Sequence, residues 1–374
     1  MVNITALLSG EPDKADGTRY SGDRPLVLVW NVTSRCNLDC VHCYSTSAFG
    51  DELSHEEALS AVDEFRRAGV KVLLFSGGEP LLREDVLELG KASSDSGIFP
   101  CLSTNGTLIT KEFARGLKEA GFIYVGVSLD GLRGTHDEFR RREGAFREAM
   151  AGMERAAGEG MKVGVRFTVT KFNYHELYDL MDLADCLEVK RFCVYHLVYS
   201  GRAEPDHDLD LHRKRTLIEG LFRKARELLE RGSQMQVLTV AGPFDGAFLY
   251  KKLAKEDPAG AKEALKALEA QGGESTGRKL LCVDPSGWVR PNQFWERRLG
   301  NIRERSLVDI ISKDPTIDAL RRLPEGLSGR CGRCAFKGVC GGFRARAEQV
   351  FGNFLAEDPA CYLSEEEIGH VPRT

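Results

Sequence analysis

Hydrophobic and polar positions follow two periods through the first half of the chain, one typical of strands and one typical of helices. Short apolar runs predict strands at 26–30, 70–75, 100–103, 124–129, 163–169 and 192–198. Between them, the helical period predicts helices at 54–68, 83–94, 111–120, 145–157 and 174–186. Strands that alternate with helices pair in parallel through right-handed crossovers. The pattern therefore indicates an α/β fold, either a partial (β/α)6 barrel or a doubly wound sheet.

Past the last of these strands the chain becomes charged and helical. Amphipathic patterns predict helices at 211–231 and 258–271, and we interpret this region as a linker. A cysteine-rich segment follows it. The sequence thus predicts four parts, which are an N-terminal extension at 1–23, the barrel at 24–205, a helical linker at 206–275 and a small C-terminal domain at 276–374.

Composition narrows the class of protein. The 374 residues are enough for one large and one smaller domain. A net charge of −4 argues against a nucleic-acid partner. No apolar stretch approaches the length of a membrane span, and the N-terminus lacks the basic region of a signal peptide. The eleven cysteines cluster with metal-type spacing, which favours a reducing cytoplasm over a disulfide framework.

Three cysteines directly after the first predicted strand carry the strongest chemical signal. Cys36, Cys40 and Cys43 have the spacing C-x3-C-x2-C. Three thiolates on one loop can bind three irons of a [4Fe–4S] cluster, which leaves the fourth iron open to a small molecule. The alternatives are buried free thiols or a zinc site, for which His42 is poorly placed between two of the cysteines.

This loop resembles that of the radical S-adenosylmethionine (SAM) enzymes, and the resemblance runs from about residue 25 onward. It implies that SAM chelates the open iron, and that one electron from the cluster cleaves SAM to give a 5′-deoxyadenosyl radical. It also favours the partial barrel over the doubly wound sheet. In such barrels the chemistry lies at the carboxyl ends of the strands.

The resemblance assigns SAM contacts to polar residues at those strand ends. Gly77, Gly78 and Glu79 match the segment that binds the methionine ammonium, although Gly-Gly-Glu-Pro can also be a simple turn. Tyr195 and His196 end the sixth predicted strand and could face substrate or donate hydrogen; the alternative for His196 is a core histidine. The candidates for the ribose and carboxylate of SAM, each of which could instead be a turn or capping residue, are Ser103, Asn105, Ser128, Asp130 and Arg166.

A second cysteine set lies near the C-terminus. Its members are Cys331, Cys334, Cys340 and Cys361, with two glycines directly after Cys340. The set resembles the SPASM extension of many radical SAM enzymes, and implies one auxiliary [4Fe–4S] cluster beside the SAM-binding one. A zinc site with four cysteines fits the spacing too. Arg344 stands where a further cysteine is often found, and Cys282 has no evident partner. We expect Cys101, Cys186 and Cys193 to be buried hydrophobes.

Three segments, at 29–33, 195–202 and 357–363, resemble the tetrapyrrole-modifying branch of these enzymes. That branch implies removal of acetate or propionate side chains from a siroheme-derived iron tetrapyrrole in heme or heme d1 biosynthesis, with reduced ferredoxin or flavodoxin as electron donor. Trp288 and Trp295 could stack on the ring. Guanidinium groups grip carboxylates well, and the candidates are Arg140, Arg141, Arg142, Arg202, Arg344 and Arg346.

Three other functions stay open at this point. Coproheme decarboxylation belongs to the same branch. A SPASM-type peptide maturase would usually carry a leader-binding domain or both auxiliary clusters, and the sequence shows neither clearly. An iron–sulfur electron carrier would need no SAM site, so the Gly-Gly-Glu segment argues against it.

Overall fold

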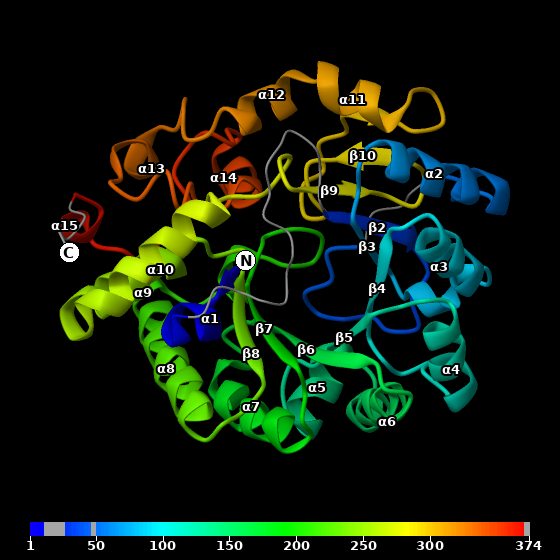
Figure 1. The fold of residues 1–374 in the computed structure, drawn as a ribbon, viewed down its shortest axis with the longest axis horizontal. Helices are drawn as coiled ribbons and strands as arrows, with labels where there is room; N and C mark the ends of the chain where they lie inside the picture. Colours follow the sequence, from blue (N-terminus) through cyan, green and yellow to red (C-terminus); the bar gives the residue numbers. More distant parts are fainter. Residues whose placement is uncertain (11–26, 46–49, 370–374) are drawn as a thin grey trace.

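One curved sheet runs through the molecule, and helices cover its outer face (Figure 1). The computed structural model describes residues 1–10, 27–45 and 50–369. Among these, the strand order is β1-β8-β7-β6-β5-β4-β3-β2-β9-β10-β11. From β2 to β8 the order in space follows the order in the chain without reversal. A doubly wound sheet reverses its order at a switch point, so the predicted partial barrel is confirmed.

The barrel strands are parallel, and each pairs with the next along the chain. The large apolar side chains of these strands fill the core, where the Trp30 ring lies 5.5 Å from Phe75 and 5.3 Å from Phe65. The strands are β2 (Val27–Thr33), β3 (Val72–Gly77), β4 (Phe99–Thr104), β5 (Tyr124–Ser128), β6 (Lys162–Val169), β7 (Arg191–His196) and β8 (Gln236–Val240).

The crossover helices follow the predicted positions, with one addition. The Ser54 side chain accepts from the Glu57 amide, and Glu57 accepts from the Ser54 amide, which together form a capping box at the start of the first crossover helix. Helix α5 (Arg133–Arg140) was not predicted because only His136, Phe139 and Arg140 in it are buried, too few to show a helical period. The others are α2 (His55–Arg67), α3 (Val86–Asp95), α4 (Lys111–Glu119), α6 (Ala145–Gly158) and α7 (Leu177–Cys186).

The region read as a linker adds to the barrel. After α8 (Leu211–Glu230), β8 pairs in parallel with β7, so the sheet has a seventh parallel strand in chain order. Helices α9 (Phe244–Glu256) and α10 (Pro258–Gln271) follow. The interpretation of 206–275 as a linker alone is therefore wrong. The short strand β1 (Val2–Asn3), before α1 (Ile4–Ser9), pairs antiparallel with β8. The predicted boundary at residue 23 lies outside the described residues.

The C-terminal part extends the other edge of the sheet. Strand β9 (Leu280–Val283) pairs in parallel with β2, and β10 (Trp288–Arg290) and β11 (Gly300–Asn301) continue from it antiparallel. The helices beyond are α11 (Leu307–Lys313), α12 (Pro315–Arg321), α13 (Gly329–Arg333), α14 (Arg344–Phe351) and α15 (Glu365–Gly369). In the described part of the chain no helix is both long and apolar enough to cross a membrane.

Candidate functional site

A cavity of about 1030 Å³ opens at the carboxyl ends of the barrel strands. It brings together residues that are far apart in the sequence. Eleven of the thirteen predicted residues outside the C-terminal cysteine set line it, and Glu79 and Asp130 do not. The eleven are Cys36, Cys40, Cys43, Gly77, Gly78, Ser103, Asn105, Ser128, Arg166, Tyr195 and His196.

The loop that carries Cys36, Cys40 and Cys43 is held by neighbouring strand ends. The Gly78 amide donates to the Thr33 carbonyl at 2.8 Å. A Cβ on Gly78 would lie 2.2 Å from the Arg35 carbonyl oxygen, so only glycine permits this approach. On the other side, Arg202 donates through its amide to the Cys43 carbonyl and through Nε to the Cys40 carbonyl, both at 2.9 Å. The loop is thus fixed between β3 and the segment after β7.

Donors converge on the sulfur atoms of this loop. The Leu38 amide lies 3.4 Å from the Cys36 sulfur, and Arg140 Nη1 lies 3.3 Å from the Cys40 sulfur. Arg140 is itself buried and ion-paired with the fully buried Asp130. Burial raises the pKa of Cys36 to about 11, so this thiol stays protonated until a metal binds it. The loop therefore offers three thiols and two donors to a metal cluster, which is the environment such clusters need.

Glu79 and Asp130 lie behind the cavity wall and accept hydrogen bonds from the residues that form it. Glu79 is fully buried and accepts from the Asn105 amide at 2.8 Å and from Thr104 Oγ1 at 2.7 Å. Burial raises its pKa to about 7. Asp130 accepts from the Thr168 amide at 2.8 Å and pairs with Arg140. The oxygens of both carboxylates are engaged inside the wall and neither residue lines the cavity, so their contact with SAM stays a prediction.

Arg166 lines the cavity and has no acid partner among the described residues. Its guanidinium stands 5.0 Å from the centre of the Tyr195 ring, and no ion pair involves it among the described residues. Burial raises the pKa of Tyr195 to about 12 although Arg166 opposes the shift. A cation in this position can receive a carboxylate.

His196 lines the cavity but is anchored behind it. Its Nε2 lies 2.8 Å from Asp245 Oδ2, and Tyr362 donates to the other oxygen of Asp245 at 2.6 Å. The His196 ring also packs edge-on against Phe244 at 5.2 Å. This arrangement favours the alternative of a satisfied core histidine, because the reactive nitrogen is already engaged.

Sequence reasoning missed two lining residues, Gln293 and Phe294, which come from the C-terminal domain. The Phe294 ring lies 5.2 Å from Tyr44, the residue after Cys43. Gln293 Oε1 is buried with no hydrogen-bond partner. Only the topology brings them here, since β9 pairs with β2 and so places the loop after β10 near the cysteine loop. No local pattern in 291–299 could have indicated it.

A second cavity, of about 390 Å³, is lined by Cys331, Cys334, Cys340 and Cys361. Backbone amides of Phe336, Gly342 and Asp358 each lie 3.4 Å from one of these sulfurs. Gly341 and Gly342 have φ of +75° and +61°, a conformation that side chains disfavour. The chain therefore surrounds this space with thiols and donors, which suits a metal cluster.

Most of the other candidates lie away from both cavities, and among the candidate arginines Arg140 lines the main one. Cys282 is fully buried in β9 and lines neither cavity, and Cys186 is exposed rather than buried. Trp295 is buried in the core, and neither it nor Trp288 lines the main cavity. The arginines expected to bind substrate carboxylates have other partners: Arg140, Arg344 and Arg346 are buried, while Arg141 and Arg202 pair with Asp39 and Arg142 pairs with Glu148.

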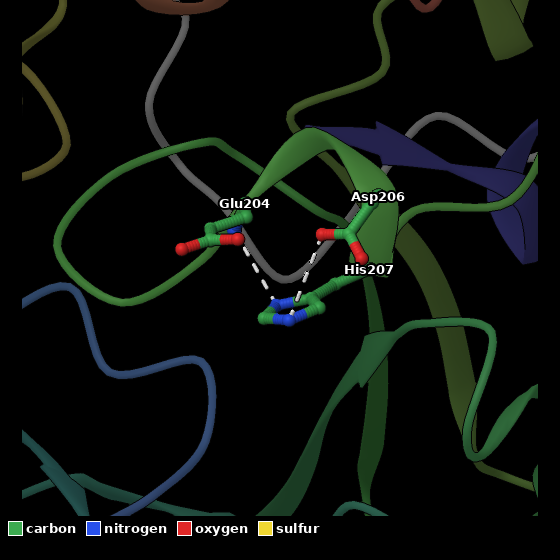
Figure 2. Close-up of side chains that lie close together, drawn as sticks. All are labelled: Glu204, Asp206 and His207. Atoms are coloured by element: carbon green, nitrogen blue, oxygen red, sulfur yellow. Dashed lines mark hydrogen bonds and ion pairs between the residues drawn. The ribbon is translucent and has the colours of Figure 1, made fainter.

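Glu204, Asp206 and His207 form a compact group of possible metal ligands at the surface (Figure 2). In the described residues it is the one group whose donor atoms all lie within 4.8 Å. His207 Nδ1 faces the Glu204 amide at 3.4 Å and its Nε2 faces Asp206 at 3.8 Å, which closes a single turn of 3-10 helix. Two of the three are exposed, and we assign no metal to them.

Comparison with known proteins agrees with this geometry. The family model of the radical SAM superfamily matches residues 30–184. The chain is 42% identical to the Fe-coproporphyrin III synthase of Methanosarcina barkeri over 99% of both chains. It is 39% identical to the pre-heme d1 synthase of Dinoroseobacter shibae, over 92% of this chain and 87% of that one. It is 33% identical to an AdoMet-dependent heme synthase of Methanosarcina barkeri, over 90% and 96%.

The chain therefore belongs to the radical SAM superfamily, and it is an iron–sulfur enzyme that uses SAM. The solved structure of native anSMEcpe with bound AdoMet has the same fold, with a TM-score of 0.71 at 21% identity over 92% of this chain and 96% of that one. Within the superfamily, the chain belongs to the branch that contains the Fe-coproporphyrin III, pre-heme d1 and AdoMet-dependent heme synthases.

Proposed function

We propose that this enzyme removes acetate side chains from a siroheme-derived iron tetrapyrrole such as didecarboxysiroheme. The observation that carries the proposal is the 42% identity, over 99% of both chains, to a protein named for making Fe-coproporphyrin III. The pre-heme d1 synthase, at 39% identity, supports the same class of substrate. Both names describe iron tetrapyrrole products, and the main cavity is lined by residues of both the barrel and the C-terminal domain.

The SAM-binding cluster is assigned to Cys36, Cys40 and Cys43. When bound there, the cluster and SAM supply a 5′-deoxyadenosyl radical that abstracts hydrogen from the substrate side chain. The residues of the chain do the positioning. Arg166 is the cation placed to receive the carboxylate of SAM, and Ser103, Asn105 and Ser128 present polar groups at the neighbouring strand ends. Arg140 and the Leu38 amide stabilise the charge on the sulfurs.

The auxiliary cluster is assigned to Cys331, Cys334, Cys340 and Cys361. The rival is a zinc ion, which draws its ligands into a tetrahedron with Zn–S bonds of about 2.3 Å. Sulfurs around one such ion lie within 4.8 Å of each other, and in the described residues no three cysteine sulfurs do. The three backbone amides that face these sulfurs support the larger group. The electron donor that we propose for this chemistry is a reduced ferredoxin or flavodoxin.

The test is an anaerobic incubation of the enzyme with SAM, a strong reductant and didecarboxysiroheme, followed by mass spectrometry. The expected result is 5′-deoxyadenosine together with tetrapyrrole that has lost its acetate groups. A decoy precursor peptide in a parallel incubation should stay unmodified. Modification of the peptide with no change in the tetrapyrrole would contradict the proposal.

A second candidate is decarboxylation of coproheme, which the 33% identity to an AdoMet-dependent heme synthase favours. Coproheme incubated in the same way distinguishes the two. If its propionates become vinyl groups while didecarboxysiroheme is left unchanged, the assignment moves to this reaction. If coproheme is untouched and the acetates are lost, the first assignment stands.

A further inference from the structure

A buried arginine stands against the auxiliary cysteine site with no acid of its own. Arg344 is fully buried, and its Nη2 lies 3.6 Å from the Cys331 sulfur. Its other donors face main-chain carbonyls, those of Gly342 at 3.1 Å, Phe354 at 2.9 Å and Ala356 at 2.6 Å. Among the described residues it takes part in no ion pair. The hydrogen-bond donors of Arg344 therefore have acceptors, but no acid neutralises its positive charge.

The charges around Arg344 leave an excess of one cation. Arg346 is also fully buried, and it pairs with the fully buried Asp358 at 3.0 Å. Burial works to raise the pKa of Asp358, yet Arg346 and, more weakly, Arg344 hold it below its usual value. Asp358 can neutralise only one of the two guanidiniums. Nearby, Lys214 is already paired with Asp208.

The other arginines beside cysteine sulfurs or this cavity are compensated. Arg140 at the SAM-binding loop pairs with Asp130. Arg330 lines the auxiliary cavity, but it pairs with Glu365 at 2.8 Å and is partly exposed. A buried unpaired charge costs several kcal/mol unless an opposite charge lies beside it. A cluster bound by four thiolates is such an anion, and Arg344 is in contact with one of its ligands.

We propose that Arg344 raises the reduction potential of the auxiliary cluster. This inference rests on the auxiliary cluster assigned above. One-electron reduction adds a negative charge to the cluster, and a fixed cation in a poorly solvated site stabilises that charge more than it would in water. Arg344 stands at the position where SPASM extensions often carry a further cysteine. It supplies a positive charge there instead of a thiolate, which favours a cluster that accepts an electron.

The test is an anaerobic redox titration with dithionite, followed by EPR, in full-length protein in which Cys36, Cys40 and Cys43 are changed to Ala. The auxiliary cluster then gives the signal alone. In Arg344→Gln, the ratio of reduced to oxidised cluster at a fixed potential should fall by about tenfold, equivalent to about 59 mV for a one-electron couple. Arg344→Lys, which keeps the charge, should stay within about threefold of the parent. Arg333→Gln is the control and should do the same, because Arg333 is exposed, pairs with Glu365 and does not line the auxiliary cavity.

Three results would overturn the inference. They are an unchanged ratio in Arg344→Gln with its cluster intact, a shift in Arg344→Lys as large as in Arg344→Gln, or loss of the cluster from both variants, which would make Arg344 a requirement for assembly. A parent protein that binds no iron at the C-terminal cysteines would instead contradict the assignment of the auxiliary cluster. Iron analysis of each variant separates these cases.

Discussion

Glu79 shows how a side chain outside the cavity sets the cavity's shape. Its two carboxylate oxygens hold the Asn105 amide, the Thr104 hydroxyl and the Leu81 amide. Asn105 and Thr104 line the cavity directly. The Gly-Gly-Glu segment therefore shapes the cavity in two ways. The backbone of Gly77 and Gly78 lines it, and the Glu79 carboxylate holds the residues of its wall.

Changing Glu79 to Ala should weaken SAM binding and lower the stability of the fold. The variant leaves three donors without an acceptor, and each buried unsatisfied group costs about 1–3 kcal/mol. SAM affinity and urea unfolding report the two effects. Glu176→Ala is the control, because Glu176 also accepts two hydrogen bonds of 2.7 Å, but its donors, Leu132 and Thr135, line neither cavity. It should lose stability and keep SAM affinity; equal loss of affinity in both variants would contradict a local role for Glu79.

Substitution of Gly78 tests how closely the end of β3 must pack against the cysteine loop. A methyl group there would lie 2.2 Å from the Arg35 carbonyl oxygen, which is backbone and cannot swing away. Gly78→Ala should displace the loop and reduce the iron bound at Cys36, Cys40 and Cys43. Gly134→Ala is the control, since a Cβ at Gly134 meets nothing within 4 Å. Iron content after anaerobic reconstitution is the measurement, and full loading of Gly78→Ala would show that the loop tolerates the shift.

At the scale of elements, the sequence was informative wherever periodicity was strong. The six predicted barrel strands and their five helices are present because each buries a regular apolar face. Strand β8 was missed although Gln236–Val240 is an apolar, β-branched run, because it lies in a region interpreted as a helical linker. The position of a strand end predicted which residues line the cavity, but not where their side chains point. Glu79, Asp130 and His196 each turn toward partners distant in sequence, such as Asp245 for His196.

An ion pair fastens the last described helix to the barrel. Arg215 of α8 donates two hydrogen bonds of 2.8 Å to Glu367 of α15, which lowers the pKa of Glu367 to about 2. A depressed folded-state pKa contributes stability above the unfolded value of 4.5, and that stability is lost as pH falls toward 2.

Glu367→Gln should therefore be less stable than the parent near neutral pH, and the difference should shrink as pH falls below about 4.5. Urea unfolding of both proteins across this range measures it. The exposed neighbour Glu366→Gln should match the parent throughout. A difference that stays constant down to about pH 3 would show that the ion pair is not its source.

At the scale of the whole molecule, buried hydrogen bonds join the auxiliary cysteine site to the barrel. Arg346, beside the auxiliary site, donates to the carbonyls of Leu197 and Ala241 at the ends of β7 and β8. Leu197 lines the main cavity.

We expect about eight iron atoms per chain, and about four after Cys36, Cys40 and Cys43 are changed to Ala. Zinc in place of the second set of irons would contradict the auxiliary cluster.

Substitutions at the two cysteine sites should have different effects on SAM cleavage and on product formation. Cys40→Ala removes a ligand of the cluster that binds SAM, so it should form neither 5′-deoxyadenosine nor product. Changing Cys331 and Cys334 to Ala leaves the main cavity intact, since neither residue lines it. That variant should still cleave SAM with a strong reductant, while tetrapyrrole product falls at least about tenfold because the electron released by fragmentation has no acceptor. Cys186→Ala, an exposed cysteine away from both cavities, is the control and should retain both activities. If the Cys331 and Cys334 variant forms product at the parent rate, the auxiliary site takes no part in the reaction and serves only to hold the C-terminal domain against the barrel.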